Sequence, residues 1–281
     1  MPASHLFTQA YGTQVIRDQA LYLAWSALAW RRTPELVVHV YTDDPGVYEP
    51  LASMIEVRTM TPEDVRRWRG PFGFTHRLKA LLVQDMVRRF PEERQLYLDA
   101  DTYLIHPPEE VLERLGPQTS VMHARESHLL EGNDPHLRNF SRRMRPLTFR
   151  GKPVDLNHWM WNAGAIGLHP ESFGAVDDWI AFIDEVWPRY KRGLVEQYGI
   201  AMRLQQGGEV LPCNDAIVHY WYQKNDFTTV IRRELAVLRT RPLSEALLHL
   251  RQRPIHVPFR EQPNHRMPFW KKWRRSFFGE R

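Results

Sequence analysis

The sequence predicts an α/β protein, a mixed, mostly parallel sheet with helices on both faces, and three observations support this. Short apolar or β-branched runs alternate along the chain with segments of helical periodicity. The 281 residues are 43% hydrophobic and 25% charged, which is an ordinary globular composition. There is no internal repeat and no low-complexity tract. We therefore expect one extended core with at most a short appendage.

The expected elements follow in order from the hydrophobic pattern. Apolar residues recur at helical spacing over 21–29, and 36–41 is a β-branched run that ends at the turn signal 43–45. The run from Leu96 to Leu98 is apolar on both faces, as in a central strand. The expected helices cover 21–29, 76–89, 176–187, 229–238 and 243–250, and the expected strands cover 36–41, 95–98, 161–168 and 216–221.

The basic character of the chain belongs to its C-terminal part. The formal net charge is +5, yet residues 1–223 hold 24 Lys and Arg against 28 Asp and Glu, whereas 224–281 hold 14 against 5. The acidic balance of the longer part argues against a broad nucleic-acid surface. We expect a catalytic domain over 1–225 and a basic, aromatic, helical C-terminal extension over 226–281.

The cysteine content and the apolar segments indicate a cytoplasmic protein. Cys213 is the only cysteine, so an intrachain disulfide and a thiolate metal cluster are both excluded. Residues 1–14 lack a basic stretch followed by an apolar run, and the segment 20–30 falls short of the roughly 20 apolar residues that a spanning helix needs. We expect no secretion signal and no integral membrane segment.

Two carboxylates follow the buried strand. Asp99 and Asp101 stand two residues apart, a spacing that places side chains on the same side of extended backbone. Ligands of open α/β sheets bind at the carboxyl ends of strands, and Mg²⁺ and Mn²⁺ prefer oxygen ligands. A calcium loop is excluded because Tyr103 and Leu104 occupy the positions of its fifth ligand and its glycine. The pattern indicates a metal site that binds a diphosphate.

The sequence resembles the GT-A-fold glycosyltransferases, and among them the retaining enzymes of glycosyltransferase family 8, which include glycogenin and bacterial lipooligosaccharide galactosyltransferases. Segments that resemble family motifs span roughly residues 8 to 225 in the family's order: 8–11, 75–79, 96–105, 161–164, 196–197 and 218–220. The chain departs from the family in two places. Little of the nucleotide motif remains at 8–11, and Lys224 follows His219 by five residues without the family's Gly or Pro.

The resemblance implies a GT-A-like sheet and a set of site residues. Asp99, Asp101 and His219 would bind the metal, Mn²⁺ or Mg²⁺, and Glu196 with Gln197 would lie at the reacting face of the donor sugar. The remaining residues implied in donor binding are Tyr11, Thr42, Asp43, Arg77, Lys79, Ala100, Asn162, Ala163, Gly164 and Lys224, of which Tyr11 would stack on the base.

Most of these residues also have a purely structural interpretation. His219 could be a core histidine, and Lys79 could belong to a solvated helix face. Glu196 and Gln197 are good surface residues at a helix start, and Asp43 suits a turn. A further structural interpretation is that residues 162–164 form a tight strand entry.

The implied function is the metal-dependent transfer of a hexose from a nucleotide sugar, UDP-linked, to a glycan or glycolipid acceptor with retention of configuration. One alternative is a nucleotidyltransferase acting on sugar phosphates, but such enzymes use a glycine-rich phosphate loop, and 4–17 contains only Gly12. The other alternative is a non-enzymatic protein that binds anionic surfaces through its basic tail.

The end of the chain has the pattern of an interfacial helix. Four aromatic residues recur at steps of three and four, opposite four basic residues; they are Phe269, Trp270, Trp273 and Phe277, and Lys271, Lys272, Arg274 and Arg275. One interpretation is docking on an anionic membrane beside a lipid-linked acceptor, as the resemblance to the bacterial enzymes implies. The other is a terminal helix that packs its aromatic residues on the catalytic domain.

Overall fold

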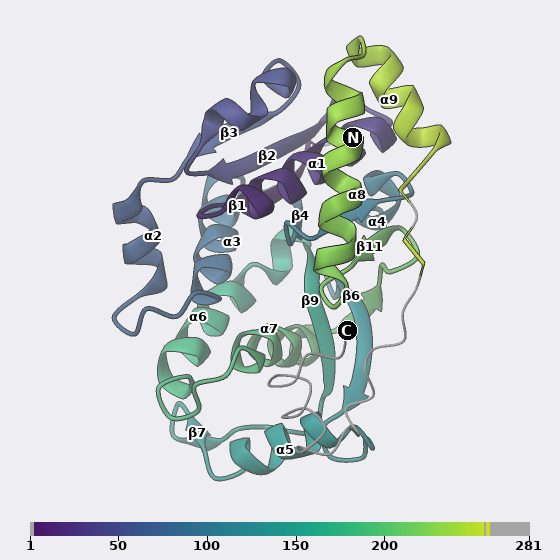
Figure 1. Ribbon diagram of the computed structural model, residues 1–281. Helices are drawn as coiled ribbons and strands as arrows, with labels where there is room; N and C mark the ends of the chain where they lie inside the picture. Colours follow the sequence, from purple (N-terminus) through teal and green to yellow (C-terminus); the bar gives the residue numbers. More distant parts are fainter. Residues whose placement is uncertain (1–2, 256, 259–281) are drawn as a thin grey trace, which may run out of the picture.

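A computed structural model describes residues 3–255 together with 257 and 258 (Figure 1). The helices are α1 (Gln14–Trp30), α2 (Pro62–Arg69), α3 (Arg77–Arg89), α4 (Pro108–Leu112), α5 (Pro135–Met144), α6 (Gly174–Val186), α7 (Leu194–Gly207), α8 (Lys224–Arg239) and α9 (Leu243–Gln252). The strands are β1 (Ser4–Ala10), β2 (Leu36–Thr42), β3 (Glu56–Thr59), β4 (Arg94–Leu98), β5 (Thr102–Leu104), β6 (Thr119–His128), β7 (Thr148–Phe149), β8 (Lys152–Pro153), β9 (Trp159–Leu168), β10 (Glu209–Pro212) and β11 (Ile217–His219).

The central sheet has seven strands in the order β10-β6-β9-β4-β1-β2-β3. Neighbouring strands are parallel except at β9, which runs antiparallel to both β4 and β6. Because β9 lies inside the sheet, it is buried along almost its whole length, which explains its apolar composition. The predicted mixed, mostly parallel α/β sheet is confirmed.

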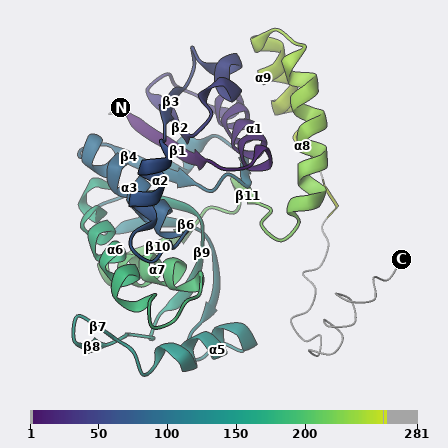
Figure 2. The ribbon, with the colours of Figure 1, turned by 60° about the vertical axis from the view of Figure 1, so that its left-hand side comes forward.

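Helices cover both faces of this sheet, as two views related by a turn of 60° show (Figures 1 and 2). On one face α1 contacts the sheet, and α8 and α9 pack on α1; on the other face α3, α6 and α7 form a layer. Each face of the sheet has its own hydrophobic core, and alternate side chains of the central strand β4 point into one or the other. Leu96 and Leu98 pack in the core on the α1 side, and Tyr97 packs in the core on the α3 side.

The expected elements are confirmed, with differences in extent: the helix expected over 21–29 begins at Gln14, and the helix expected over 229–238 begins at Lys224. The segment expected as a strand over 216–221 is shorter, Ile217–His219, and pairs with β5 in a separate two-stranded sheet. It stops there because the next residues turn: Tyr220 N donates to Asp101 O, and Gln223 N donates to Tyr220 O. The antiparallel direction of β9 and the strands β3, β6 and β10 were not expected from the pattern.

No helix within the described residues is both long enough and apolar enough to cross a membrane. The aromatic and basic segment 267–281 lies outside the described residues, so its expected amphipathic helix stays a prediction.

Candidate functional site

The Asp99 and Asp101 carboxylates converge in a tight turn. Strand β4 ends at Leu98. The backbone carbonyl oxygen of Asp99 then accepts hydrogen bonds from Thr102 N at 3.1 Å and from Thr102 Oγ1 at 2.8 Å. The expectation that extended backbone aligns the two side chains is therefore wrong, because residues 99–101 form a turn and not a strand. The turn, at the carboxyl end of a central strand, brings the two carboxylates together.

His219 reaches this turn through strand pairing. Strand β11 runs antiparallel to β5 and places His219 opposite Thr102, the residue that closes the turn. One ligand atom from each of Asp99, Asp101 and His219 lies within 4.8 Å of the other two. The grouping of these three residues from the sequence is thus matched by their positions.

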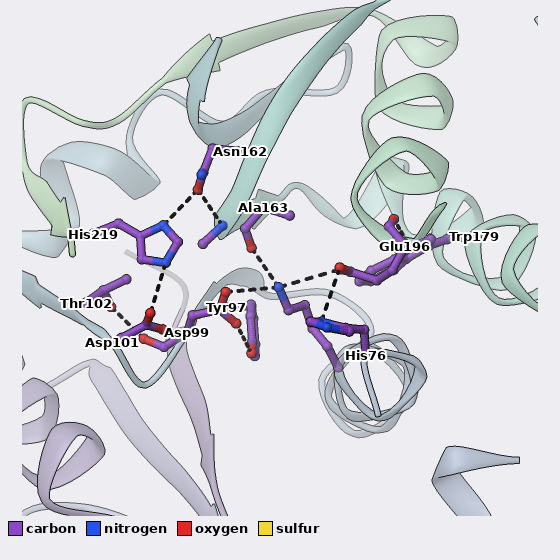
Figure 3. Close-up of polar contacts among 12 residues, drawn as sticks. His76, Tyr97, Asp99, Asp101, Thr102, Asn162, Ala163, Trp179, Glu196 and His219 are labelled. Atoms are coloured by element: carbon purple, nitrogen blue, oxygen red, sulfur yellow. Dashed lines mark hydrogen bonds and ion pairs between the residues drawn. The ribbon is translucent and has the colours of Figure 1, made fainter. Parts of the chain in front are cut away.

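A second contact fixes the orientation of the His219 ring. Asn162 Oδ1 accepts a hydrogen bond from Gly164 N at 3.0 Å and lies 2.8 Å from His219 Nδ1 (Figure 3). Since Asn162 Oδ1 is an acceptor, Nδ1 carries the ring proton, which leaves the lone pair on Nε2. The ring lies against Gly164, where an added Cβ would stand 2.1 Å from Nδ1. Segment 162–164 therefore positions the histidine.

The geometry of these groups fits a divalent cation. His219 Nε2 lies 3.5 Å from Asp101 Oδ2, so two acceptors face each other. Adjacent ligands of an octahedral ion with bonds of about 2.1 Å stand about 3 Å apart, close to this spacing. Histidine ligands also usually donate their other ring N–H to a neighbouring oxygen, as His219 does here. A donor set of two carboxylates and an imidazole can hold a divalent cation.

A lysine ammonium already lies against this donor set. Lys224, the first residue of α8, places Nζ 2.9 Å from Asp101 Oδ2. The pKa of Asp101 is lowered: burial opposes its ionisation, but the His219 ring, when it is doubly protonated, and the charge of Lys224 outweigh burial. The site therefore attracts positive charge strongly.

On the other side of the turn, Lys79 joins Asp99 to Glu196. Lys79 Nζ donates to Asp99 Oδ2 at 3.0 Å and to Ala163 O at 3.0 Å, and it lies 3.5 Å from Glu196 Oε1. Tyr97 Oη donates to the other Asp99 oxygen at 2.6 Å. The interpretation of Lys79 as part of a solvated face is wrong, because its side chain is 6% exposed. A buried cation here serves two carboxylates.

Glu196 is held by the packing of α7 on α6. Its backbone oxygen accepts from Trp179 Nε1 of α6 at 2.8 Å, and its side chain is only 4% exposed, so the interpretation as a surface residue is wrong. Burial raises the pKa of Glu196 to about 7, against the lowering effect of the Lys79 charge. His76 Nδ1 lies 3.9 Å from its second oxygen.

Gln197 belongs to a separate hydrogen-bonded group, which does not include Lys79. Gln197 Nε2 donates to Glu126 Oε2 at 3.0 Å, and Asn162 Nδ2 donates to Glu126 Oε1 at 3.3 Å. Through Glu126 on β6, the start of α7 is thereby linked to the residue that orients His219. Glu126 was not identified from the sequence.

The three metal-site residues, the two lysines, Glu196 and Gln197 line one open cavity of about 700 Å³. Its lining consists of His76, Lys79, Asp99, Asp101, Glu126, Ser127, Asp134, His136, Leu137, Asn162, Ala163, Gly164, Leu194, Glu196, Gln197, His219, Trp221 and Lys224. Cavities of roughly 300–1,000 Å³ hold small molecules and cofactors. Ala100 sits between the two carboxylates in the turn.

Besides Ala100, four of the expected donor-binding residues lie outside this lining. Arg77 is bound to Asp184 at 2.6 Å and to Trp68 O at 2.8 Å. Asp43 accepts from Gly12 N and Arg17, and Thr42 caps the same turn through Asp44 N. Tyr11 lies under the Arg69 guanidinium. These contacts fit structural roles, and the four residues stay predictions as donor contacts.

The cavity residues that the sequence did not reveal come mostly from one region. Glu126, Ser127, Asp134, His136 and Leu137 belong to β6, to the segment after it or to the start of α5. That region has no clear periodicity in the sequence. Its best local signal is Asp134 before Pro135, an N-cap followed by proline, and Asp134 does accept from His136 N and Leu137 N.

Comparisons with known proteins find similar chains among the solved structures. No protein-family model matches the chain, and no curated protein matches it. Among solved structures, the chain is similar to mouse xyloside xylosyltransferase 1 in its apo form, with 14% sequence identity over 83% of this chain and 93% of that chain, and a TM-score of 0.49.

Proposed function

We propose that this protein is a metal-dependent glycosyltransferase that moves a hexose from a nucleotide sugar, UDP-linked, to a glycan or glycolipid acceptor. The observation that carries the proposal is the convergence of Asp99, Asp101 and His219 at the carboxyl end of a central strand, inside a cavity of about 700 Å³. Paired carboxylates with an imidazole suit a cation that binds a diphosphate. The motif resemblance to glycosyltransferase family 8 supports the same activity.

In this proposal, the cation and two lysines balance the charge of the donor. A divalent cation held by Asp99, Asp101 and His219 would act as a Lewis acid toward the departing nucleoside diphosphate. Lys79 holds the Asp99 carboxylate in place through their 3.0 Å contact, in which both side chains are largely shielded from solvent. Lys224 is half exposed and can turn from Asp101 toward a bound phosphate.

The second group, Glu196 and Gln197, is assigned to the sugar. Glu196 is buried beside Lys79, and Gln197 is held by Glu126, so both side chains are fixed at the cavity wall. We propose that they face the donor sugar and that the reaction proceeds with retention. Proton NMR of the first product formed from an α-linked donor tests this, because a β product excludes retention.

Thermal melting tests the activity class most directly. A ligand that binds only the folded protein must raise its melting temperature. UDP with Mn²⁺ should raise it, and UDP with chelator should raise it less. A panel of nucleotide sugars, assayed by donor hydrolysis, then identifies the base and the sugar. The absence of any shift with every nucleotide and metal pair would reject the proposal in favour of a binding protein.

The catalytic region proposed here is 1–225, since every residue given a role precedes 226. Helices α8 and α9 follow it and pack on α1. For 267–281 we keep the proposal of an interfacial helix on an anionic membrane, which would make this a peripheral cytoplasmic enzyme. Truncation after Pro263 should abolish sedimentation with anionic vesicles; equal sedimentation of both forms at low salt contradicts it.

A further inference from the structure

A strongly cationic lobe lies at one end of the molecule. It consists of α5, β7 and β8, inserted between β6 and β9, together with residues 188–192 between α6 and α7. Residues 135–152 contain six Arg or Lys and no Asp or Glu, and residues 188–192 contain three and none. In both views α5 and β7 lie at the end of the molecule away from α9 (Figures 1 and 2). This group of cations thus lies far from the C-terminal helix α9.

This lobe encloses a cavity of about 970 Å³. Five of its lining residues are cations, and the whole lining is Asn139, Arg142, Arg143, Pro146, Leu147, Arg189, Tyr190, Lys191 and Arg192. The polar partners observed for these cations are neutral: Arg142 donates to Asn139 Oδ1 at 2.9 Å, and Arg189 donates to Thr148 Oγ1 at 3.2 Å. Within the described residues, no carboxylate forms an ion pair with any of the five.

Two acidic residues of α6 are engaged outside this cavity. Asp178 pairs with Arg150 and Arg203, and Glu185 accepts from the backbone N–H of Arg150. Their charge is therefore directed to Arg150, which is not part of the lining. The five cations are exposed, and together they create a positive potential in one concavity that attracts an anionic ligand.

The cationic cavity and the metal-site cavity have no lining residue in common, but their linings include near neighbours on the same two segments. Leu137 of α5 lines the metal-site cavity, and Asn139, two residues on, lines the cationic cavity. In the same way Arg192 lines the cationic cavity and Leu194 lines the other. Both cavities therefore flank α5 and residues 192–194, so a chain molecule with one end near the metal site can reach the cationic cavity around these segments.

From this arrangement we infer that the cationic cavity binds the acidic groups of the acceptor, which is an oligosaccharide carrying carboxylates or phosphates. The inference rests on the proposed function for the identity of the acceptor, but the binding itself does not. Arginine binds both groups with two parallel hydrogen bonds. A concave cavity with Tyr190 and Leu147 in its wall suits a discrete chain better than the flat surface of a bilayer.

Binding of defined oligomers tests the inference. The probes are a linear hexamer of uronic acid, a glycerol phosphate oligomer of equal charge, a neutral glucose hexamer and vesicles containing phosphatidylglycerol. The variant R143Q/R192Q removes one cation from each wall. The control, R66Q/R239Q, removes two arginines that are also exposed but lie on α2 and α8. Circular dichroism and melting temperature check that each variant is folded.

The wild type should bind one or both acidic oligomers and not the neutral hexamer, with affinity that falls as salt rises. R143Q/R192Q should weaken this binding about tenfold or more, since hydrogen bonds to charged groups are strong, and the control should stay within about twofold. The relative affinity for uronate and phosphate identifies the acidic group.

Three results would overturn the inference: no binding of either acidic oligomer by the wild type, equal weakening in both double variants, or tighter binding of vesicles than of free oligomers through Arg143 and Arg192. The proposed function fails separately. If the acidic oligomer binds through these arginines but no nucleotide with metal raises the melting temperature, the anion site stands and the transferase proposal falls. If nucleotide binds and the oligomers do not, only the inference falls.

Discussion

Two lysines contact the Asp99 and Asp101 turn from opposite sides, and their surroundings differ greatly. Lys79 lies 3.0 Å from Asp99 Oδ2, and Lys224 lies 2.9 Å from Asp101 Oδ2. The Lys79 side chain is 6% exposed and has two further oxygen partners, Ala163 O and Glu196 Oε1. The Lys224 side chain is 52% exposed, at the first position of α8.

This difference shows which part of the site can change when a ligand binds. Moving Lys79 away would leave a buried charge without its partners, which costs several kcal/mol. Moving Lys224 away costs little, because water can solvate its ammonium group. An incoming cation would therefore replace Lys224 at Asp101, while Asp99 and Lys79 keep their places. The Lys79 side is a fixed frame, and the Lys224 side is adjustable.

The largest expected effect comes from Asp101→Ala. Asp101 is the carboxylate that contacts the adjustable lysine and faces His219, so its loss should abolish metal-dependent donor turnover. The fold should survive, as judged by circular dichroism. The exposed carboxylate of Asp177→Ala on α6 provides the control. Residual turnover above about a tenth of wild type, a loss under ~1.4 kcal/mol, contradicts the assigned role.

Asp99→Ala should abolish turnover nearly as strongly, but its effect on stability should differ. From the sequence alone we would expect the fold to tolerate it as well as Asp101→Ala. The structure shows that Asp99 is the closest carboxylate partner of buried Lys79, so the variant should also unfold more easily. Chemical denaturation of the two variants side by side measures the difference in their free energies of unfolding. Equal values would show that the Lys79 side and the Lys224 side of the turn contribute equally to stability.

The next effect in size is expected for Gly164→Ala. An added Cβ would stand 2.1 Å from His219 Nδ1, so the ring must move and lose its contact with Asn162. Affinity for Mn²⁺ should fall about tenfold or more, since groups that orient a ligating histidine typically contribute that much. Gly174→Ala, where a Cβ meets nothing within 4 Å, is the matched control. Equal metal affinity in both variants would show that His219 is not a ligand.

Much of the fold and part of the site could be predicted from sequence because the signals are local. The apolar run of β4 and the spacing in α1, α3 and α6 reflect burial on one or two faces, which the sequence displays directly. Asp99 and Asp101 follow such a strand at once. Their convergence was expected for the wrong reason, because a turn and not a pleat brings them together.

The rest depends on contacts between residues far apart in the chain. Glu196 looks like a surface residue in its own helix, and only the packing of α7 on α6 buries it beside Lys79. Glu126 lies in a region without periodicity, and its role appears when β6 pairs with β9. The cationic cavity likewise joins α5 to residues 189–192, which no local pattern relates.

Glu196→Gln tests the fixed side of the site, because it should change how the free energy of unfolding depends on pH. The pKa of Glu196 is raised to about 7 from an ordinary 4.5, so the folded protein holds a proton that the unfolded chain releases between these values. The free energy of unfolding should therefore lose a contribution, at most about 3 kcal/mol, as pH rises from about 4.5 to about 7. Glutamine mimics the protonated acid and lacks this loss.

Because buried histidines also make stability depend on pH, the contribution of Glu196 has to be measured as the difference between the wild type and Glu196→Gln. His39 and His123, with pKa values lowered to about 3 and about 4 by burial, change the stability of both proteins in the opposite direction over part of the same range. Subtracting the Glu196→Gln curve from the wild-type curve, from denaturant unfolding at pH 5 to 8, removes their contribution. A difference that does not change with pH would mean that Glu196 stays ionised beside Lys79.

The smallest effect, and the most specific for the adjustable side, is expected for Lys224→Met. The Lys224 ammonium group competes with the cation for Asp101. Its removal should therefore raise the affinity for Mn²⁺ alone a few-fold, which is the size expected for a half-exposed ion pair. Affinity for UDP in the presence of Mn²⁺ should instead fall about tenfold, because a charge-assisted hydrogen bond to phosphate is lost. Lys152→Met, which changes an exposed lysine on β8 outside the cavity lining, should alter neither affinity.

The opposite signs of the two changes distinguish two roles of Lys224. If Lys224 only contributed to a general positive field, its removal would weaken UDP binding and raise the metal affinity only at low salt. If Lys224 exchanges Asp101 for the phosphate, both changes should also be seen at physiological salt. A parallel fall of both affinities would show that Lys224 does not leave Asp101 when the cation binds.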